Sequence, residues 1–335
     1  MRLENILALT HANLLNEPCV NSFESIVFDA QKIKRGDLFI AFNTEFIEEA
    51  VHNGAYGIMF EKHIEVIDTE IAWIKVDNIK DALKRLLRFK MIEKEVVAYE
   101  CNEIILKLAL QIVTPLNCLV LDGDIKTTFN SLWHVQSRTT VLFCPALVDK
   151  NIFTNIKTFP KTAIEPIKIM EQTLFETSFI YDNKFYERRL ISPFFIPFLE
   201  KLFHLYKSLK IDFKLKKFTP IEHFEAVFTN KNFEIKEFGT SDKVLIFEKN
   251  SDLIAQEIRF LQKNASWAKI VFILPFSHAK ENENYENILT YKHENEIVSI
   301  LKNTNFHFAL IAGVDKSILL KPLTNQKQLS LFSLC

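Results

Sequence analysis

Near its N-terminus the chain alternates short apolar runs with turn residues and one stretch of helical periodicity. Residues 26–28 and 38–42 are apolar runs of the length of buried strands, and residues 35–37 supply a turn between them. Apolar residues then recur at helical spacing over residues 46–51, and Gly54 follows where a left-handed residue ends a helix at low cost. This alternation restricts the segment to a unit in which buried strands pack against a helix.

The following residues continue the alternation. Residues 56–60 and 71–76 are predicted to be further strands, and Asn78 is placed to cap a helix over residues 81–89. We therefore expect the N-terminal region to form a compact α/β unit.

The length and charge of the chain limit the classes of protein to which it can belong. A chain of 335 residues with 48% hydrophobic residues supports two or three domains with sizeable cores. Its formal net charge of −1 argues against a broad nucleic-acid-binding surface. Residues 1–7 lack the apolar core of a secretory signal, and no run approaches the roughly 20 apolar residues of a spanning helix. We expect a cytoplasmic protein with no membrane span and no direct nucleic-acid contact.

Glycine is scarce: the chain has 6, whereas average usage of about 7% would give roughly 23. Loops that wrap phosphates need closely approaching backbone N–H groups and positive φ angles, which glycine supplies and bulky residues resist. The strand expected at residues 95–99 runs into residues 100–106 with no glycine between them. The shortage argues against nucleotide chemistry, although an AT-biased coding style rich in Phe and Lys would also lower the count.

The cysteines and histidines give no indication of a metal site. The five cysteines form no C-x-x-C pair, and their odd number fits reduced, buried thiols better than a disulfide framework. The nine histidines show neither H-x-x-x-H nor H-E-x-x-H spacing. We therefore expect no metal-binding residues.

A longer pattern runs through the N-terminal residues. It consists of Asp29, the run Gly36-Asp37-Leu38-Phe39-Ile40-Ala41, a helix at residues 46–50 and the pair Gly54-Ala55. This pattern resembles the N-terminal domain of the Mur ligases, which add amino acids to UDP-MurNAc in peptidoglycan synthesis. The similarity is closest to the member that adds D-alanyl-D-alanine.

The same segment departs from the family at the groups that help to hold the uridine nucleotide. The usual Ser and Arg are Ala30 and Gln31 in this chain, and the family's glycine-containing loop is reduced to residues 43–45. The departure places the binding of a UDP-sugar in question.

The resemblance implies an α/β, three-domain architecture of the Mur-ligase type. Its expected parts are an N-terminal domain at 1–92, a shortened, degenerate central P-loop-type domain at 93–217, a Rossmann-like C-terminal domain at 218–323 and a tail at 324–335. In the C-terminal part, apolar runs alternate with helical stretches over connections long enough for a parallel sheet. These segments lie at residues 244–247, 251–262, 269–274, 294–301 and 308–312.

The central domain is where the family binds ATP and Mg, through a glycine-rich loop near residue 100 and a lysine that neutralises the transferred phosphate. Here Lys107 lies inside the expected helix, and we interpret it as a surface lysine. Asp122 and Asp124 follow a strand and form the chain's best magnesium-like pair, although acidic turn residues after strands are common. We therefore expect no cofactor, and neither ATP nor Mg in particular.

Other positions where the family carries its chemistry are also changed. The strand at residues 140–143 ends in Cys144, where the family has a metal-binding Glu. The strand ends at 248–252 and 312–316 lack the family's D-D-S-Y-N-A-N-P and K-G-S motifs. The aromatic helix expected at 192–209 is interpreted as core and not as a ligand platform.

Two hypotheses of different class follow from these departures. The first is a catalytically inactive, Mur-ligase-like bacterial pseudoenzyme that has no catalytic residues and acts by binding in peptidoglycan synthesis or cell shape. Its expected partners are peptidoglycan-precursor enzymes or UDP-MurNAc-peptide. The alternative is an active ATP-dependent amide ligase for UDP-MurNAc-peptide with a remodelled site, which would need phosphate-binding groups from elsewhere in the chain.

The tail gives a further alternative. Gln328, Leu329, Leu331 and Phe332 lie in a Gln-Leu-Ser-Leu-Phe run that resembles the peptide with which bacterial replication and repair proteins dock on the DNA sliding clamp. Two apolar side chains of an extended tail would enter a pocket while the glutamine binds at its edge. The competing interpretation is that the tail packs its Leu and Phe side chains onto the last domain.

Overall fold

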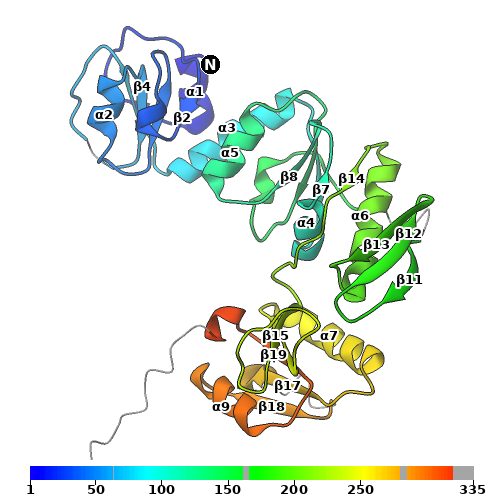
Figure 1. Cartoon of the computed structure of the whole chain (residues 1–335). Coiled ribbons are helices and arrows are strands. Elements are labelled where there is room, and N and C mark those ends of the chain that lie inside the picture. The colour runs from blue at the N-terminus through cyan, green and yellow to red at the C-terminus, as the bar shows by residue number, and fades with distance from the viewer. Residues whose placement is uncertain (63, 161–165, 280–284, 320–335) are drawn as a thin grey trace, which may run out of the picture. The chain divides into compact units, whose positions relative to one another are not determined.

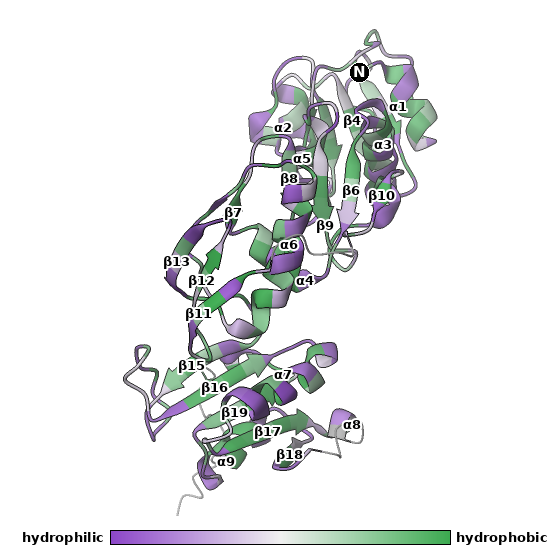
Figure 2. Ribbon diagram, turned by 90° about the vertical axis from the view of Figure 1, so that its right-hand side faces the viewer, coloured by the Kyte–Doolittle hydropathy of each residue, from purple (hydrophilic) through white to green (hydrophobic). Residues whose placement is uncertain are grey.

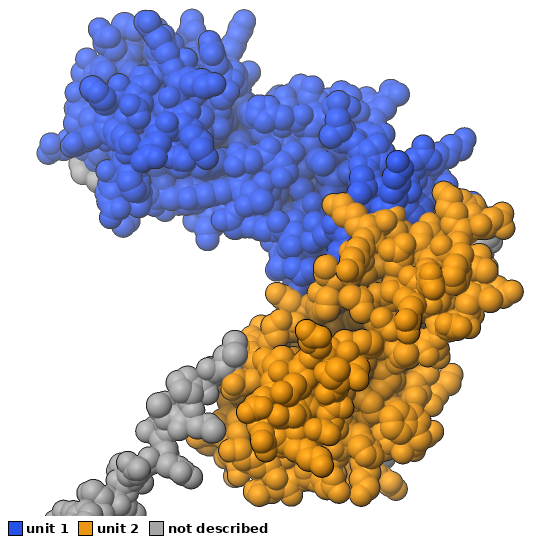
Figure 3. Space-filling model, viewed as in Figure 1, with its two compact units in different colours: residues 1–161, 205–214 blue, residues 162–204, 215–335 orange. Residues whose placement is uncertain are grey.

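The computed structural model describes residues 1–62, 64–160, 166–279 and 285–319. The chain divides into two compact units, which Figure 3 distinguishes by colour. Unit 1 comprises residues 1–161 and 205–214, and unit 2 comprises residues 162–204 and 215–335. The finer division into three domains stays a prediction.

Unit 1 opens with a five-stranded sheet in the order β1-β5-β4-β3-β2. Figure 1 labels β2 and β4 of this sheet. Strands β2 to β5 are parallel, and β1 pairs with β5 antiparallel. The bounds are β1 Asn13–Leu14, β2 Ile26–Val27, β3 Leu38–Ala41, β4 Gly57–Phe60 and β5 Ala72–Lys75. The predicted N-terminal α/β unit is confirmed.

Three helices flank this sheet: α1 Leu3–Thr10, α2 Ile47–His52 and α3 Ile79–Glu93. Gly54 has φ +95° just past α2, and its N–H donates to the carbonyl of Val51, so its predicted role as a helix stop is confirmed. Oδ1 of Asn78 accepts from the N–H of Asp81 at 3.0 Å, which confirms the predicted cap of α3. The turn before β3 includes the 3-10 helix η1 Ala30–Lys32 and Gly36 with φ +102°.

The second sheet of unit 1 has four parallel strands in the order β10-β6-β9-β8. Its strands are β6 Val97–Glu100, β8 Cys118–Leu121, β9 Thr140–Phe143 and β10 Ile156–Lys157. The helices are α4 Glu103–Ala109 and α5 Ile125–Trp133, with the 3-10 helix η2 Lys150–Ile152 before β10. A short strand β7, Ile112–Val113, follows α4.

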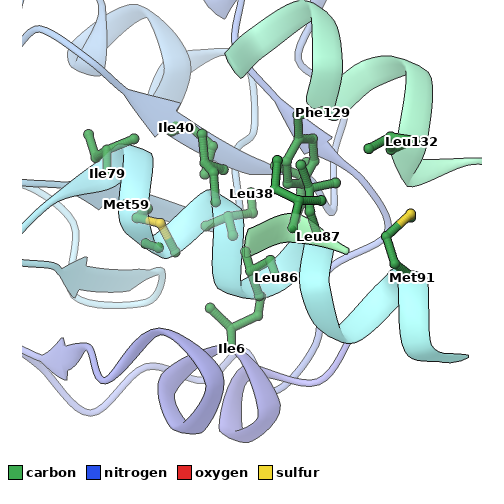
Figure 4. Close-up of a cluster of buried hydrophobic side chains, with 14 of the residues drawn as sticks. Ile6, Leu38, Ile40, Met59, Ile79, Leu86, Leu87, Met91, Phe129 and Leu132 are labelled. Carbon is green, nitrogen blue, oxygen red and sulfur yellow. The ribbon is translucent and has the colours of Figure 1, made fainter. Parts of the chain in front are cut away.

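One hydrophobic core joins the two sheets of unit 1. Leu86 and Leu87 of α3 lie between Ile6 of α1 and Phe129 of α5, and all four side chains are buried (Figure 4). The apolar positions of α3 recur at helical spacing on two adjoining faces, so one helix can cover both neighbours. The two sheets therefore form a single packed body.

Unit 2 begins with a three-stranded antiparallel sheet in the order β11-β12-β13. The strands are β11 Lys168–Gln172, β12 Thr177–Tyr181 and β13 Lys184–Arg189, and they precede η3 Pro193–Phe195 and α6 Ile196–Ser208. Phe194 stacks on Phe224 with ring centroids 5.4 Å apart, and Phe203 of α6 packs on Tyr181 at 4.6 Å. The aromatic side chains of this helical stretch therefore serve mainly as core, as predicted.

The last sheet has the order β15-β16-β19-β17-β18. Its strands are β15 Glu225–Thr229, β16 Lys243–Glu248, β17 Ile270–Pro275, β18 Ile288–Tyr291 and β19 Phe308–Ala312, after a short β14 Lys214–Leu215. All pairs are parallel except the edge pair β15 and β16. Strands β17 and β19 are strongly hydrophobic in Figure 2, as expected for strands inside a parallel sheet.

The helices of this part are α7 Ser251–Asn264, α8 Phe276–Ala279, α9 Asn295–Asn303 and the 3-10 helix η5 Lys316–Leu319. Asn250 caps α7 by accepting from the N–H of Asp252 at 3.0 Å. The predicted alternation of strands and helices in a parallel sheet is confirmed. None of the described helices is long and apolar enough to cross a membrane.

Candidate functional site

Only two residues, Cys101 and Asn102, separate the end of β6 from the start of α4, so the connection is tight. Oδ1 of Asn102 accepts a hydrogen bond of 2.9 Å from the N–H of Ile105 and caps the helix. The N–H of Cys101 donates to the carbonyl of Phe143 in β9 at 3.0 Å. Two backbone amides of this junction are thus engaged within the chain itself.

The side chains at the junction do not suit a phosphate group. Glu100 is exposed at the end of β6, and Glu103 is half-buried in the first turn of α4. Two carboxylates at this position offset the positive end of the helix dipole and repel an anion. The residues present at the β6–α4 junction therefore do not fit the phosphates of ATP.

Lys107 and the candidate magnesium pair lie nearby at the surface of unit 1. Nζ of Lys107 lies 3.2 Å from Oδ2 of Asp122, so each balances the charge of the other. Oδ1 of Asp124 accepts from the N–H of Thr127 at 2.9 Å, and this hydrogen bond lowers the pKa of Asp124. Asp122 therefore belongs to an ion pair and Asp124 to a helix cap. The described residues contain no group of three or more side chains arranged to hold a metal ion.

The thiols at the ends of β6 and β9 are buried. Cys101 and Cys144 retain 7% and 5% of their exposure. Burial raises the pKa of Cys101 to about 12, with a smaller contribution from Cys144, and burial also raises the pKa of Cys144. Both side chains are neutral thiols near pH 7, which agrees with their interpretation as small hydrophobic residues. Cys19 is exposed, so the prediction of buried thiols is wrong for that residue.

A pocket of about 490 Å³ lies in unit 1 beside the segment that carries the N-terminal pattern. We call it the Phe28 pocket, and its lining comes from the β2–η1 connection, β3, the start of α2 and α5. Its residues are Phe28, Asp29, Ala30, Gln31, Phe39, Ile40, Phe42, Asn43, Phe46, Glu49 and Lys126. The structure thus brings together the positions 29–31 and 43 that the sequence pattern singles out.

The Phe28 pocket combines aromatic faces with a cation. The rings of Phe28 and Phe42 lie 6.2 Å apart, and Nζ of Lys126 lies 4.5 Å from the centroid of Phe42. Asp29 is already used, since its Oδ1 accepts from the N–H of Gln31 at 3.1 Å. The pocket can take a ligand with a flat apolar face and polar edges, with one ammonium group available to a negative charge.

Unit 2 contains a buried polar cluster at the carboxyl end of β16. Glu248 and Glu257 are fully buried, and Nδ1 of His223 lies 3.0 Å from Oε1 of Glu248. Burial alone would raise the pKa of Glu248, but hydrogen bonds, led by that with His223, lower it. Burial and the charge of Glu248 raise the pKa of Glu257 well above its ordinary value.

Sequence reasoning missed Lys126 and this buried cluster. Lys126 follows the acidic turn at residues 122–124, and only the folded chain brings it to Phe42. His223, Glu248 and Glu257 are spaced like ordinary surface residues, although Glu257 falls on the apolar face of α7 with Leu253, which is a detectable signal. The predicted tail residues Gln328, Leu329, Leu331 and Phe332 lie outside the described residues.

No family model matches this sequence. Over 91 residues the chain is 35% identical to the UDP-N-acetylmuramoyl-L-alanyl-D-glutamate–2,6-diaminopimelate ligase of Clostridium tetani. The match covers 25% of this chain and 19% of that protein, so the chain spans about a fifth of the length of this curated relative.

Solved structures extend the likeness beyond that segment. A UDP-N-acetylmuramoylalanyl-D-glutamyl-2,6-diaminopimelate–D-alanyl-D-alanyl ligase of Acinetobacter baumannii aligns with a TM-score of 0.50 and 9% identity, over 95% of this chain and 96% of that one. A crystal structure of MurF from the same organism aligns with a TM-score of 0.53 and 10% identity, over 93% and 95%. The predicted α/β fold of the Mur-ligase type and the resemblance to this family are confirmed.

Proposed function

We propose that this Mur-ligase-like chain does not carry out ATP-dependent ligation and acts by binding within peptidoglycan synthesis. The observation that carries the proposal is the β6–α4 junction, where Asn102 caps the helix and Glu100 and Glu103 flank it. A phosphate-binding loop needs unengaged amides and a surplus of positive charge. At this junction two amides are engaged within the chain, and the flanking carboxylates give a surplus of negative charge.

The Phe28 pocket supports a role in binding. The relatives named above are ligases of UDP-N-acetylmuramoyl peptides. The pocket lies at the positions where Ala30 and Gln31 replace the family's Ser and Arg, so other side chains of its lining would have to hold such a ligand. Phe28 and Phe42 can contact the faces of a uracil ring, and Lys126 can pair with a phosphate. We therefore propose a UDP-MurNAc-peptide as the ligand class, with enzymes of the same pathway as further partners.

Two calorimetric titrations of the full chain test this proposal, one with Mg·ATP and one with UDP-MurNAc-tripeptide. We expect no saturable heat with ATP, no ligation of D-alanyl-D-alanine, and saturable binding of the UDP-sugar. Lys126→Met should weaken that binding, whereas Lys80→Met, an exposed lysine of α3 outside the pocket, should leave it unchanged.

The absence of ATP-dependent ligation and the binding of a UDP-sugar can each be contradicted separately. Micromolar, saturable ATP binding would establish the alternative of a ligase with a remodelled site. Absence of UDP-sugar binding would remove the precursor as ligand and leave a protein partner of the pathway to be sought by pull-down.

A further inference from the structure

Unit 2 carries a second pocket, of about 390 Å³, that is lined by five aromatic rings. We call it the Trp267 pocket. The rings come from the β11–β12 turn, β15, the β15–β16 loop, the segment after α7 and the start of β19. They are Phe175, Phe228, Phe238, Trp267 and Phe308.

The rings form one continuous aromatic surface. Phe175 and Phe238 each meet Phe228 edge-on, at centroid distances of 5.4 and 5.0 Å. Phe308 lies 6.4 Å from Phe175 and 5.9 Å from Trp267, which joins all five rings. Trp267 nevertheless keeps 75% of its exposure and Phe238 keeps 45%. Large aromatic side chains that gather around a hollow and stay exposed to water indicate a surface that another group covers.

The polarity of the Trp267 pocket restricts its occupant. None of the described residues that line it is charged, and its polar groups are uncharged side chains such as Gln172, Ser241 and Asn264. A phosphate or carboxylate buried here would have no cation to pair with it. An uncharged, apolar segment with a few hydrogen-bonding groups fits the lining.

The position of the Trp267 pocket in the fold also distinguishes it from the Phe28 pocket. Val244 and Phe308 lie at the beginnings of β16 and β19, whereas open α/β sheets bind ligands beyond the carboxyl ends of their strands. The Phe28 pocket belongs to unit 1, so the Trp267 pocket is a separate feature of unit 2.

We propose that the Trp267 pocket receives the chain's own C-terminal segment, with Leu331 and Phe332 as its apolar anchors. Residues 328–335 read Gln-Leu-Ser-Leu-Phe-Ser-Leu-Cys and contain no charged side chain, which matches the uncharged lining. Gln328 and the serines supply hydrogen-bonding groups for the amides at the rim. The segment lies outside the described residues, and the proposal rests on its composition, its length and the pocket itself.

The length of chain after Leu319 is sufficient for this contact. Twelve residues lead from Leu319 to Leu331 and extend up to about 40 Å, whereas a compact domain of about 100 residues has a radius of gyration near 13 Å. A tethered segment is also present at an effective concentration of about millimolar, so even a weak contact is occupied.

Fluorescence of Trp267 in the full chain provides the test. We expect the double change Leu331→Ala, Phe332→Ala to shift the emission to longer wavelength and to raise the acrylamide quenching constant. A chain with Ser330→Ala and Ser333→Ala should keep the original emission. Trp267→Phe, made in both backgrounds, should abolish the difference, since Trp73 is buried and Trp133 lies outside the pocket.

A substitution in the pocket itself tests whether the tail and the pocket contact each other. Phe175→Ala should expose Trp267 as the tail change does, and the two changes combined should add nothing further, because both break the same contact. Phe276→Ala, an exposed ring outside the pocket, should have no effect.

Three results would overturn the proposal. The first is unchanged quenching of Trp267 in the tail variant. The second is additive effects of Phe175→Ala and the tail change. The third is that protection of Trp267 from acrylamide quenching increases with protein concentration, which would identify a second copy of the chain as the occupant.

Discussion

Nδ1 of His223 lies 3.0 Å from Oε1 of Glu248, and both side chains are buried in unit 2. The carboxylate also accepts from the N–H of Phe224 at 3.1 Å and from that of Asn250 at 2.7 Å. Glu248 therefore ties the segment before β15 to the start of α7 at the carboxyl end of β16.

Removal of the histidine should destabilise unit 2 strongly. His223→Leu leaves the carboxylate of Glu248 buried without its imidazole hydrogen-bond partner, and an unsatisfied buried polar group of this kind costs about 1–3 kcal/mol. Urea denaturation followed by far-UV circular dichroism measures the change. His293→Leu, at an exposed position of the same unit, should stay within about 0.5 kcal/mol of the original. Equal stability of the two variants would refute the structural role of the pair.

The pair Glu248 and Glu257 should give the protein a stability that depends on pH. Burial and the charge of Glu248 raise the pKa of Glu257, so the folded chain keeps a proton that the unfolded chain releases above its ordinary value of 4.5. The contribution of Glu257 is therefore complete below pH 4.5 and is lost as the pH rises through the raised pKa. The lowered pKa of Glu248 acts in the opposite sense, with stability present above pH 4.5 and lost as the pH falls.

The neutral variant Glu257→Gln isolates the first of these effects. It cannot ionise, so its free energy of unfolding should decline less between pH 5 and 9 than that of the original chain. Urea midpoints across that range measure the difference. Parallel pH profiles for the two proteins would show that Glu257 does not titrate as inferred.

The sequence predicted the regular elements because their local signals agree with their tertiary surroundings. Asn78 and Gly54 mark helix ends by side-chain chemistry and backbone conformation, both of which are local properties. The apolar run at residues 38–42 appears as a fully buried parallel strand, β3, because sheet and helices cover both its faces.

The pockets and the buried cluster were not predictable in the same way. His223 and Glu257 are 34 positions apart, and neither differs in type from a surface residue. Lys126 reaches Phe42 only because α5 packs beside the first sheet. Such sites depend on distances between segments, and a single sequence does not contain those distances.

Gly54 provides a test of backbone conformation alone. Its φ is +95°, and an added Cβ would lie 3.6 Å from Cα of Arg35, so the space is adequate and the strain lies in the backbone. Gly54→Val should therefore cost more than the roughly 1 kcal/mol of a helix-interior change. Gly54→Asn should cost less than the valine, because Asn tolerates the left-handed region. Thermal unfolding of both variants gives the comparison, and equal stability of the valine variant would contradict the assignment.

Asn102 separates the structural role of the β6–α4 junction from nucleotide binding. Asn102→Ala removes the cap of α4 and should cost about 1 kcal/mol, whereas Asn102→Gly should cost only a few tenths. Neither change should create affinity for ATP, since Glu100 and Glu103 remain at the junction. Urea titrations and calorimetry with Mg·ATP measure the two effects, and ATP binding by the glycine variant would show that the cap alone blocks the site.

Stability measurements can test the hypothesis that the tail binds the sliding clamp. If Gln328, Leu329, Leu331 and Phe332 form a docking peptide, the change Leu331→Ala, Phe332→Ala should abolish capture by the bacterial clamp and leave the melting temperature unaltered. If these side chains are buried on unit 2, the same change removes packed apolar groups and should lower stability by up to several kcal/mol. Thermal melts beside a pull-down with purified clamp distinguish the two cases.

A stricter test uses the Trp267 pocket, because the clamp and the pocket would compete for the side chains of Leu331 and Phe332. Phe175→Ala weakens the pocket without touching the tail, so it should increase capture by the clamp if both contacts exist. Phe276→Ala is the matched control and should leave capture unchanged. Two results would eliminate the clamp as a partner of the tail. The first is that the variant Leu331→Ala, Phe332→Ala is still captured by the clamp. The second is that this variant loses much of its stability while the original chain is not captured at all.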